Sequence, residues 1–163
     1  MIKEPYITLL NNMVKIMKEE FKDDLTSVVL YGSVARGDNR NDSDVDLLII
    51  IKNLPKDSML KRIRLFETKV EDKLNLDEYW KNGYYISLSP ILKTPEEAEK
   101  ISPLYLDMAY DAIILYDKNQ FFTKILQKLK ERLKELGAER VRMGKKWYWV
   151  LKKDSKFGDT IEL

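Results

Sequence analysis

The sequence predicts an α/β fold in which helices pack on a small mixed β-sheet, followed by a C-terminal helix and a β-hairpin. Helical and strand patterns alternate along the chain, which is typical of this class. The run from Leu47 to Ile51 is apolar throughout, as expected for a strand covered on both faces. No internal repeat, linker or low-complexity segment interrupts the 163 residues. We therefore expect a single domain over 1–163, with a core over 1–93 and a helical and hairpin extension over 94–163.

The helices and strands of the core are predicted from the spacing of apolar residues and from residues typical of helix starts. A helix is expected where apolar side chains recur every three or four residues, beginning at Pro5. Strands are expected where apolar residues are continuous or alternate, and Pro55 fits a helix start. The predicted order is a helix over 5–21, strands over 25–31 and 45–51, a helix from Pro55 that fades around 76–79, and a strand over 84–92.

The extension begins with Thr94-Pro95-Glu96-Glu97, a helix start in which Thr94 is the N-cap and Glu97 completes a capping box. Asp117 can cap a later helix, which Gly137 ends. The predicted order is one or two helical turns over 104–108, a strand over 112–116, a helix over 119–136, and a hairpin over 139–151 that turns at Gly144.

The amino-acid composition excludes several classes of chemistry. The chain has no cysteine and no histidine, so disulfides, thiol chemistry and imidazole ligands are excluded, and acid–base and metal work must fall to carboxylates. The net charge of +2 gives no reason to expect a protein that coats nucleic acid. We find no signal-peptide pattern and no apolar run long enough to span a membrane, and we expect a cytoplasmic protein.

The stretch from Val28 to Ile50 carries the functional pattern: a strand, a Gly32-Ser33 turn, Arg36, a polar loop, and a second strand that opens with Asp44-Val45-Asp46. Strand residues two apart point to the same face, so Asp44 and Asp46 aim two carboxylates at one spot. Such a pair suits Mg²⁺, with Mn²⁺ as the alternative, when substrate phosphates supply further ligands. Gly32 permits a close backbone approach, the Ser33 hydroxyl and nearby amides suit phosphate, and Arg36 adds a fixed positive charge.

These motifs resemble the DNA polymerase beta-like nucleotidyltransferase superfamily, and most of all its minimal nucleotidyltransferases, over roughly the first 90 residues. The resemblance implies a nucleotidyltransferase-like fold and Mg²⁺-dependent transfer of an NMP group from an NTP, ATP being the expected donor. The acceptor is a hydroxyl on a small molecule, a protein or an RNA. Minimal nucleotidyltransferases often act beside a helical partner protein as toxin–antitoxin pairs, so a protein partner is also expected, and a homo-oligomer remains an alternative.

One part of the family pattern is missing. The resemblance implies a third carboxylate on the strand after the helix, but no acidic residue lies between Glu78 and Glu96, and Ser87, or alternatively Ser89, occupies the slot. Three explanations stay open. A later acid such as Asp107 or Asp111 folds back, the enzyme works with two carboxylates, or it has lost transfer and is a nucleotide-binding or partner-binding module.

The predicted hairpin alternates aromatic and cationic residues, with Trp147 and Trp149 flanked by arginines and lysines. One interpretation is that the tryptophans cover an edge of the core. The other is that they stack on bases of RNA or DNA while the cations meet its phosphates.

Overall fold

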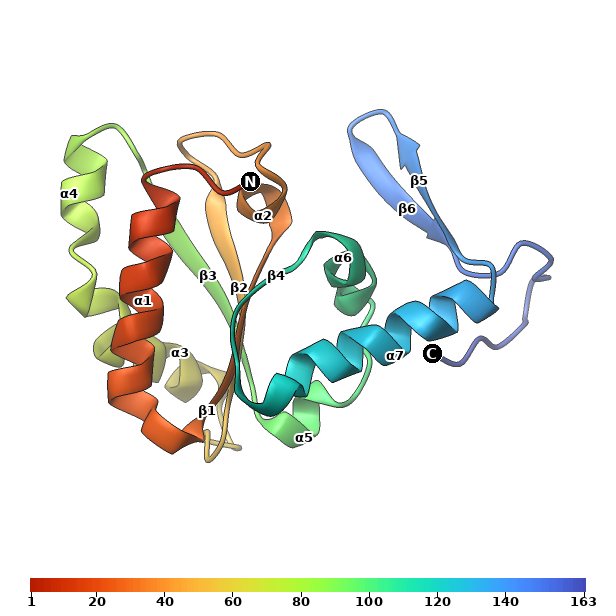
Figure 1. The fold of residues 1–163 in the computed structure, drawn as a ribbon, viewed down its shortest axis with the longest axis horizontal. Coiled ribbons are helices and arrows are strands. Elements are labelled where there is room, and N and C mark those ends of the chain that lie inside the picture. Colours follow the sequence, from red (N-terminus) through yellow and green to blue (C-terminus); the bar gives the residue numbers. More distant parts are fainter.

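The computed structural model describes all 163 residues and centres on a four-stranded mixed sheet with the order β3-β2-β1-β4 (Figure 1). The strands are β1 (Leu25–Tyr31), β2 (Asp44–Ile51), β3 (Ser87–Lys93) and β4 (Ile113–Asp117). β1 pairs antiparallel with both β2 and β4, whereas β2 and β3 are parallel. The predicted mixed sheet is confirmed, and β1 and β2 are its central strands.

Helices cover both faces of the sheet (Figure 1). One face is covered by α1 (Tyr6–Phe21), α3 (Met59–Lys69) and α4 (Leu76–Lys81), and the other by α5 (Pro95–Ala98), α6 (Leu104–Asp111) and α7 (Phe121–Glu135). The short helix α2 (Gly32–Arg36) follows β1 directly, and three 3-10 turns cover Lys22–Asp24, Glu71–Lys73 and Lys118–Gln120. None of the helices combines the length and the apolar character that a membrane span requires.

The strand β2 divides its side chains between two cores. Leu47 and Ile49 pack in the core beneath α1 and α3, and Leu48 and Ile50 pack in the core beneath α6 and α7. This division is why the strand is apolar without alternation, since neither face is open to water. Asp44 and Asp46 share the side of Leu48 and Ile50, at the start of the strand.

The long helix expected from Pro55 to about residue 79 is wrong in its boundaries. Ser58 is the N-cap and its hydroxyl accepts the amide of Lys61, while the carbonyl of Pro55 accepts a hydrogen bond from the Arg62 guanidinium and stays outside the helix. The helix ends before Val70, and α4 is a separate element.

A buried arginine ties α3 to the start of α5. Arg62 is 3% exposed and donates two hydrogen bonds to the Glu97 carboxylate, at 2.7 and 2.9 Å. The same guanidinium donates to the carbonyls of Pro55 and Leu92. Glu97 also accepts the amide of Thr94, whose hydroxyl accepts the Glu97 amide, so the predicted capping box is confirmed. This cluster joins α3, the end of β3 and α5.

The predicted hairpin is confirmed as β5 (Glu139–Met143) and β6 (Lys146–Val150), with Gly144 in the turn at a φ of +62°. It lies beside α6, away from the four-stranded sheet (Figure 1). Trp149 is half-buried against the core of α6 and α7, as one interpretation of the tryptophans expected. Trp147 is 44% exposed, so this side chain does not cover an edge of the core.

Candidate active site

The turn after β1 brings the backbone directly against the carboxylate of Asp46. Gly32 has a φ of +74°, which side chains rarely tolerate, and a Cβ added there would collide with Oδ2 of Asp46. The short helix α2 ends at Gly37, which has a φ of +81° and donates its amide to the carbonyl of Ser33. The glycine at position 32 is therefore a requirement for placing the turn beside the acidic residue.

Asp44 and Asp46 face the same side of β2, with Asp44 exposed and Asp46 partly buried. Burial raises the pKa of Asp46, the negative charge of Asp44 raises it further, and the positive charge of Arg36 opposes both. Burial followed by the charge of Asp46 raises the pKa of the neighbouring Tyr31 to about 12, so this phenol stays protonated at neutral pH. The two carboxylates thus repel one another at a spot that favours a cation.

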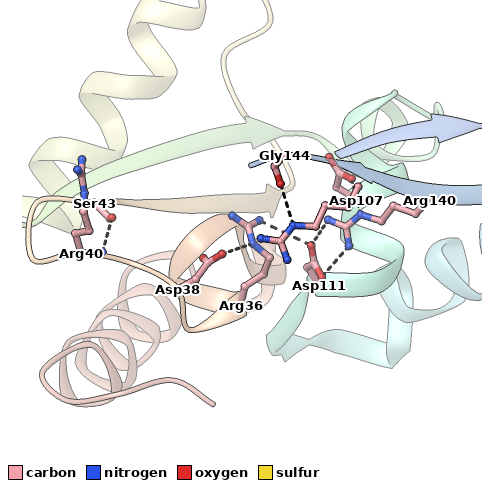
Figure 2. Close-up of polar contacts among 9 residues, drawn as sticks. Arg36, Asp38, Arg40, Ser43, Asp107, Asp111, Arg140 and Gly144 are labelled. Carbon is pink, nitrogen blue, oxygen red and sulfur yellow. Dashed lines mark hydrogen bonds and ion pairs between the residues drawn. The ribbon is translucent and has the colours of Figure 1, made fainter. Parts of the chain in front are cut away.

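Arg36 extends from the end of α2 between two acidic side chains, as Figure 2 shows. Its Nε donates to Asp38 at 3.3 Å, and its Nη1 lies 3.8 Å from Oδ2 of Asp111 on α6. Its Nη2 has no ion-pair or hydrogen-bond partner in the protein. Its positive charge lowers the pKa of Asp46, so the guanidinium and the acidic pair interact electrostatically.

The strand β3 presents serines opposite the two acids. In the parallel register of β2 and β3, Ser87 is opposite Asp44 and Ser89 is opposite Asp46, and both serines are exposed. Paired residues of neighbouring strands share a face, so hydroxyl groups stand where the resemblance implied an acid. No group of three or more acidic side chains is placed to hold a metal ion.

The explanation that a later acid folds back into this slot has no support from the structure. Asp107 and Asp111 both lie on α6, and both are engaged by Arg140 of the hairpin. Asp111 does come to the site, but beside Arg36 rather than beside Asp44 and Asp46. Asp111 and Arg140 are neighbours that sequence reasoning missed, since no local motif marks a pair 29 residues apart.

The fold and this acidic pair beside a Gly-Ser turn define a nucleotidyltransferase, and the profile of the "Nucleotidyltransferase domain" family matches residues 10–143. The chain therefore belongs to this family, as its motifs predicted. Two relatives from Methanocaldococcus jannaschii, each named "putative protein adenylyltransferase", are 34% identical to it. The first aligns over 141 residues, 85% of this chain and 90% of the relative, and the second over 86 residues, 53% and 77%. The solved toxin–antitoxin complex MntA–HepT contains a similar chain, with 14% identity, a TM-score of 0.45, and coverage of 80% of this chain and 92% of that one.

Alanine at Gly32 is expected to lower kcat/KM for nucleotide transfer by about a hundredfold, because the new Cβ displaces either the turn or the Asp46 carboxylate. The positive φ adds a loss of stability of about 1–3 kcal/mol. Gly83→Ala is a matched control, since Gly83 has a φ of +84° and nothing within 4 Å of an added Cβ. Steady-state kinetics and thermal unfolding of both variants separate the effects. Equal loss of activity in the two variants would contradict the close approach at Gly32.

Proposed function

We propose that this protein transfers AMP from ATP to a hydroxyl group on an acceptor protein. The observation that carries the proposal is the convergence of Asp44, Asp46 and Arg36 at the Gly32 turn, which supports binding of a metal-bound triphosphate. The choice of a protein acceptor is supported by the names of the two 34% identical relatives. The exposed setting of Asp44 suits a large acceptor that approaches from solvent.

A divalent cation of the Mg²⁺ type fits the residues present. Asp44 and Asp46 supply hard oxygen ligands on one face, and the effect of one charge on the pKa of the other favours a cation between them. Mg²⁺ commonly takes one or two carboxylates and completes its shell with water and substrate phosphates, so two acids are sufficient for binding. When bound, the ion neutralises charge on the phosphates and polarises the α-phosphorus.

The chain's own residues position the triphosphate. The Gly32 turn and the Ser33 hydroxyl are proposed to contact phosphate oxygens, and Arg36 to offer its free Nη2 to the charge that develops on the pyrophosphate. The acceptor oxygen forms a bond to the α-phosphorus as the bond to pyrophosphate breaks. The acceptor proton passes to solvent or to a group of the acceptor, because β3 offers only Ser87 and Ser89.

The test is to follow label from ATP. The protein is incubated with Mg²⁺ or Mn²⁺, a cell extract, and ATP labelled at either the α- or the γ-phosphate. We expect the α label alone to enter a macromolecule that survives nuclease and is destroyed by protease. Label removed by nuclease would support the RNA interpretation of the hairpin instead. Entry of the γ label in place of the α label would refute adenylyl transfer.

The serine at position 87 favours a second candidate, a nucleotide-binding module that engages a partner protein without turnover. A neutral hydroxyl binds Mg²⁺ weakly and is a poor base near neutral pH. Binding of Mg·ATP without release of pyrophosphate in the presence of the extract would favour this function. Pyrophosphate release that depends on a protein fraction of the extract would favour transfer.

Aspartate at Ser87 is expected to raise kcat by about tenfold or more, because it adds a carboxylate beside Asp44 that can hold metal and accept the acceptor's proton. Without Mg²⁺ the variant should unfold at a lower temperature than wild type, since three acids would repel, and Mg²⁺ should reverse this loss. Ser87→Asn is the control of equal size without charge. Equal activity in the two variants would show that a missing carboxylate does not limit the reaction.

A further inference from the structure

The carboxylate of Asp111 lies between two arginines from different parts of the chain (Figure 2). Arg140, on β5, donates to both of its oxygens, with Nη1 3.1 Å from Oδ1 and Nη2 2.6 Å from Oδ2. The side chains of Arg140 and Asp111 are only 10% and 16% exposed. This is a bidentate pair shielded from solvent, which is a stronger and more specific contact than a surface ion pair.

The same carboxylate reaches the proposed phosphate-binding arginine. Nη1 of Arg36 lies 3.8 Å from Oδ2 of Asp111, the oxygen that also accepts from Arg140. With its Nε on Asp38, the Arg36 guanidinium is held on two sides, and its orientation leaves Nη2 free. Without the carboxylate, Arg36 and Arg140 would present two like charges to one another across the gap that Asp111 fills.

The hairpin has a second anchor that does not involve Asp111. Trp149 donates its indole N–H to Asp107 at 3.1 Å, and its ring packs against Tyr110 at a centroid distance of 5.3 Å. Nε of Arg140 also lies 3.5 Å from Asp107. Docking of the hairpin on α6 is thus supported independently, so the contact of Asp111 with Arg36 is open to a separate role.

We propose that Asp111 is a positioning residue that orients Arg36 toward the triphosphate, and that Arg140 of the hairpin fixes Asp111 for this purpose. The inference rests on the proposed function, because it takes Arg36 as a ligand of ATP phosphates. It makes the C-terminal hairpin part of the nucleotide site, although the hairpin lies outside the four-stranded sheet. Loss of the Arg140–Asp111 pair therefore weakens ATP binding through Arg36.

The decisive variants separate orientation of Arg36 from docking of the hairpin. Asp111→Asn keeps size and a hydrogen-bonding oxygen but removes the charge. The exchanged pair D111R/R140D restores an ion pair between α6 and β5 while placing a cation beside Arg36. Trp149→Phe loosens the second anchor and leaves Asp111 untouched. Equilibrium binding of Mg·ATP, steady-state kinetics and thermal unfolding are measured for each variant.

We expect Asp111→Asn to weaken Mg·ATP binding by about tenfold, with a rise in KM and a fall in kcat as well, because Arg36 is proposed to meet charge that develops on the pyrophosphate. The exchanged pair should unfold at a higher temperature than R140D alone yet bind Mg·ATP no better than Asp111→Asn. Trp149→Phe should bind Mg·ATP within about twofold of wild type. Wild-type affinity in either Asp111→Asn or the exchanged pair would overturn the inference and leave the proposed function standing. A wild-type protein that does not bind Mg·ATP would instead overturn the proposed function, and this inference with it.

Discussion

Replacing both Asp44 and Asp46 by asparagine is expected to lower kcat for adenylyl transfer by at least about a thousandfold. The amides keep the shape of the carboxylates but lose the charge that would hold a divalent cation against the triphosphate. The loss should appear in kcat as well as in KM, because the neutralised charge develops in the transition state. Transfer of the α label from ATP to the acceptor measures it.

The same double variant should be no less stable than wild type. In the absence of metal, burial and the neighbouring Asp44 raise the pKa of Asp46, so the pair carries unfavourable charge that asparagine removes. We expect an equal or higher unfolding temperature without Mg²⁺, and a smaller shift on adding Mg²⁺ and ATP. Asp57→Asn, at an exposed ion pair with Lys61, is the control that should keep full activity. Transfer that survived in the double variant would contradict the role proposed for the two acids.

The arrangement of this acidic pair was predictable because every part of it is local. Two residues of one strand, a glycine turn and an arginine within α2 lie close together in the sequence, and strand periodicity fixes which side chains share a face. The sequence also shows that the residues of β3 include no carboxylate, and the register of the sheet places Ser87 opposite Asp44. What the residues do in catalysis stays a prediction.

The parts that sequence reasoning missed depend on distant contacts. Asp111 was a candidate for the third carboxylate and Arg140 one of the cations of the hairpin, but nothing in the sequence paired them, and only the docking of β5 on α6 brings them together near Arg36. The helix expected from Pro55 to about 79 was wrong in its boundaries. Its periodic apolar residues continue past Val70, but the backbone leaves the helical conformation at Val70, with a φ of −124° and a ψ of −62°.

Glutamine at Glu97 is expected to lower the free energy of unfolding by about 2–3 kcal/mol, the largest loss among the single polar substitutions considered. Arg62 is 3% exposed, and the change leaves its buried charge with only neutral acceptors, among them the carbonyls of Pro55 and Leu92. This expected loss of free energy lies below the usual cost of breaking a buried ion pair, because Glu97 is 42% exposed and the glutamine amide can still accept hydrogen bonds. Denaturant unfolding measures the loss.

The opposite change, Arg62→Met, should lower the free energy of unfolding by only about 1–2 kcal/mol, because it removes the buried charge and lets Glu97 turn to solvent. Glu135→Gln, at an exposed pair with Arg132, should stay within about 0.5 kcal/mol of wild type. A larger loss for Arg62→Met than for Glu97→Gln would mean that packing of the arginine stem outweighs its charge.

Acid unfolding gives an independent check on the same pair. Hydrogen bonds from Arg62 are the main cause that lowers the pKa of Glu97 from 4.5 to about 2 in the folded protein. Because the folded pKa lies below the unfolded one, the stabilisation is present above about pH 4.5 and is lost as the pH falls toward 2. Glu97→Gln lacks this titration, so its free energy of unfolding should fall less steeply than that of wild type between these pH values. Parallel curves would place the stabilisation in the neutral contacts of Arg62 rather than in its ion pair.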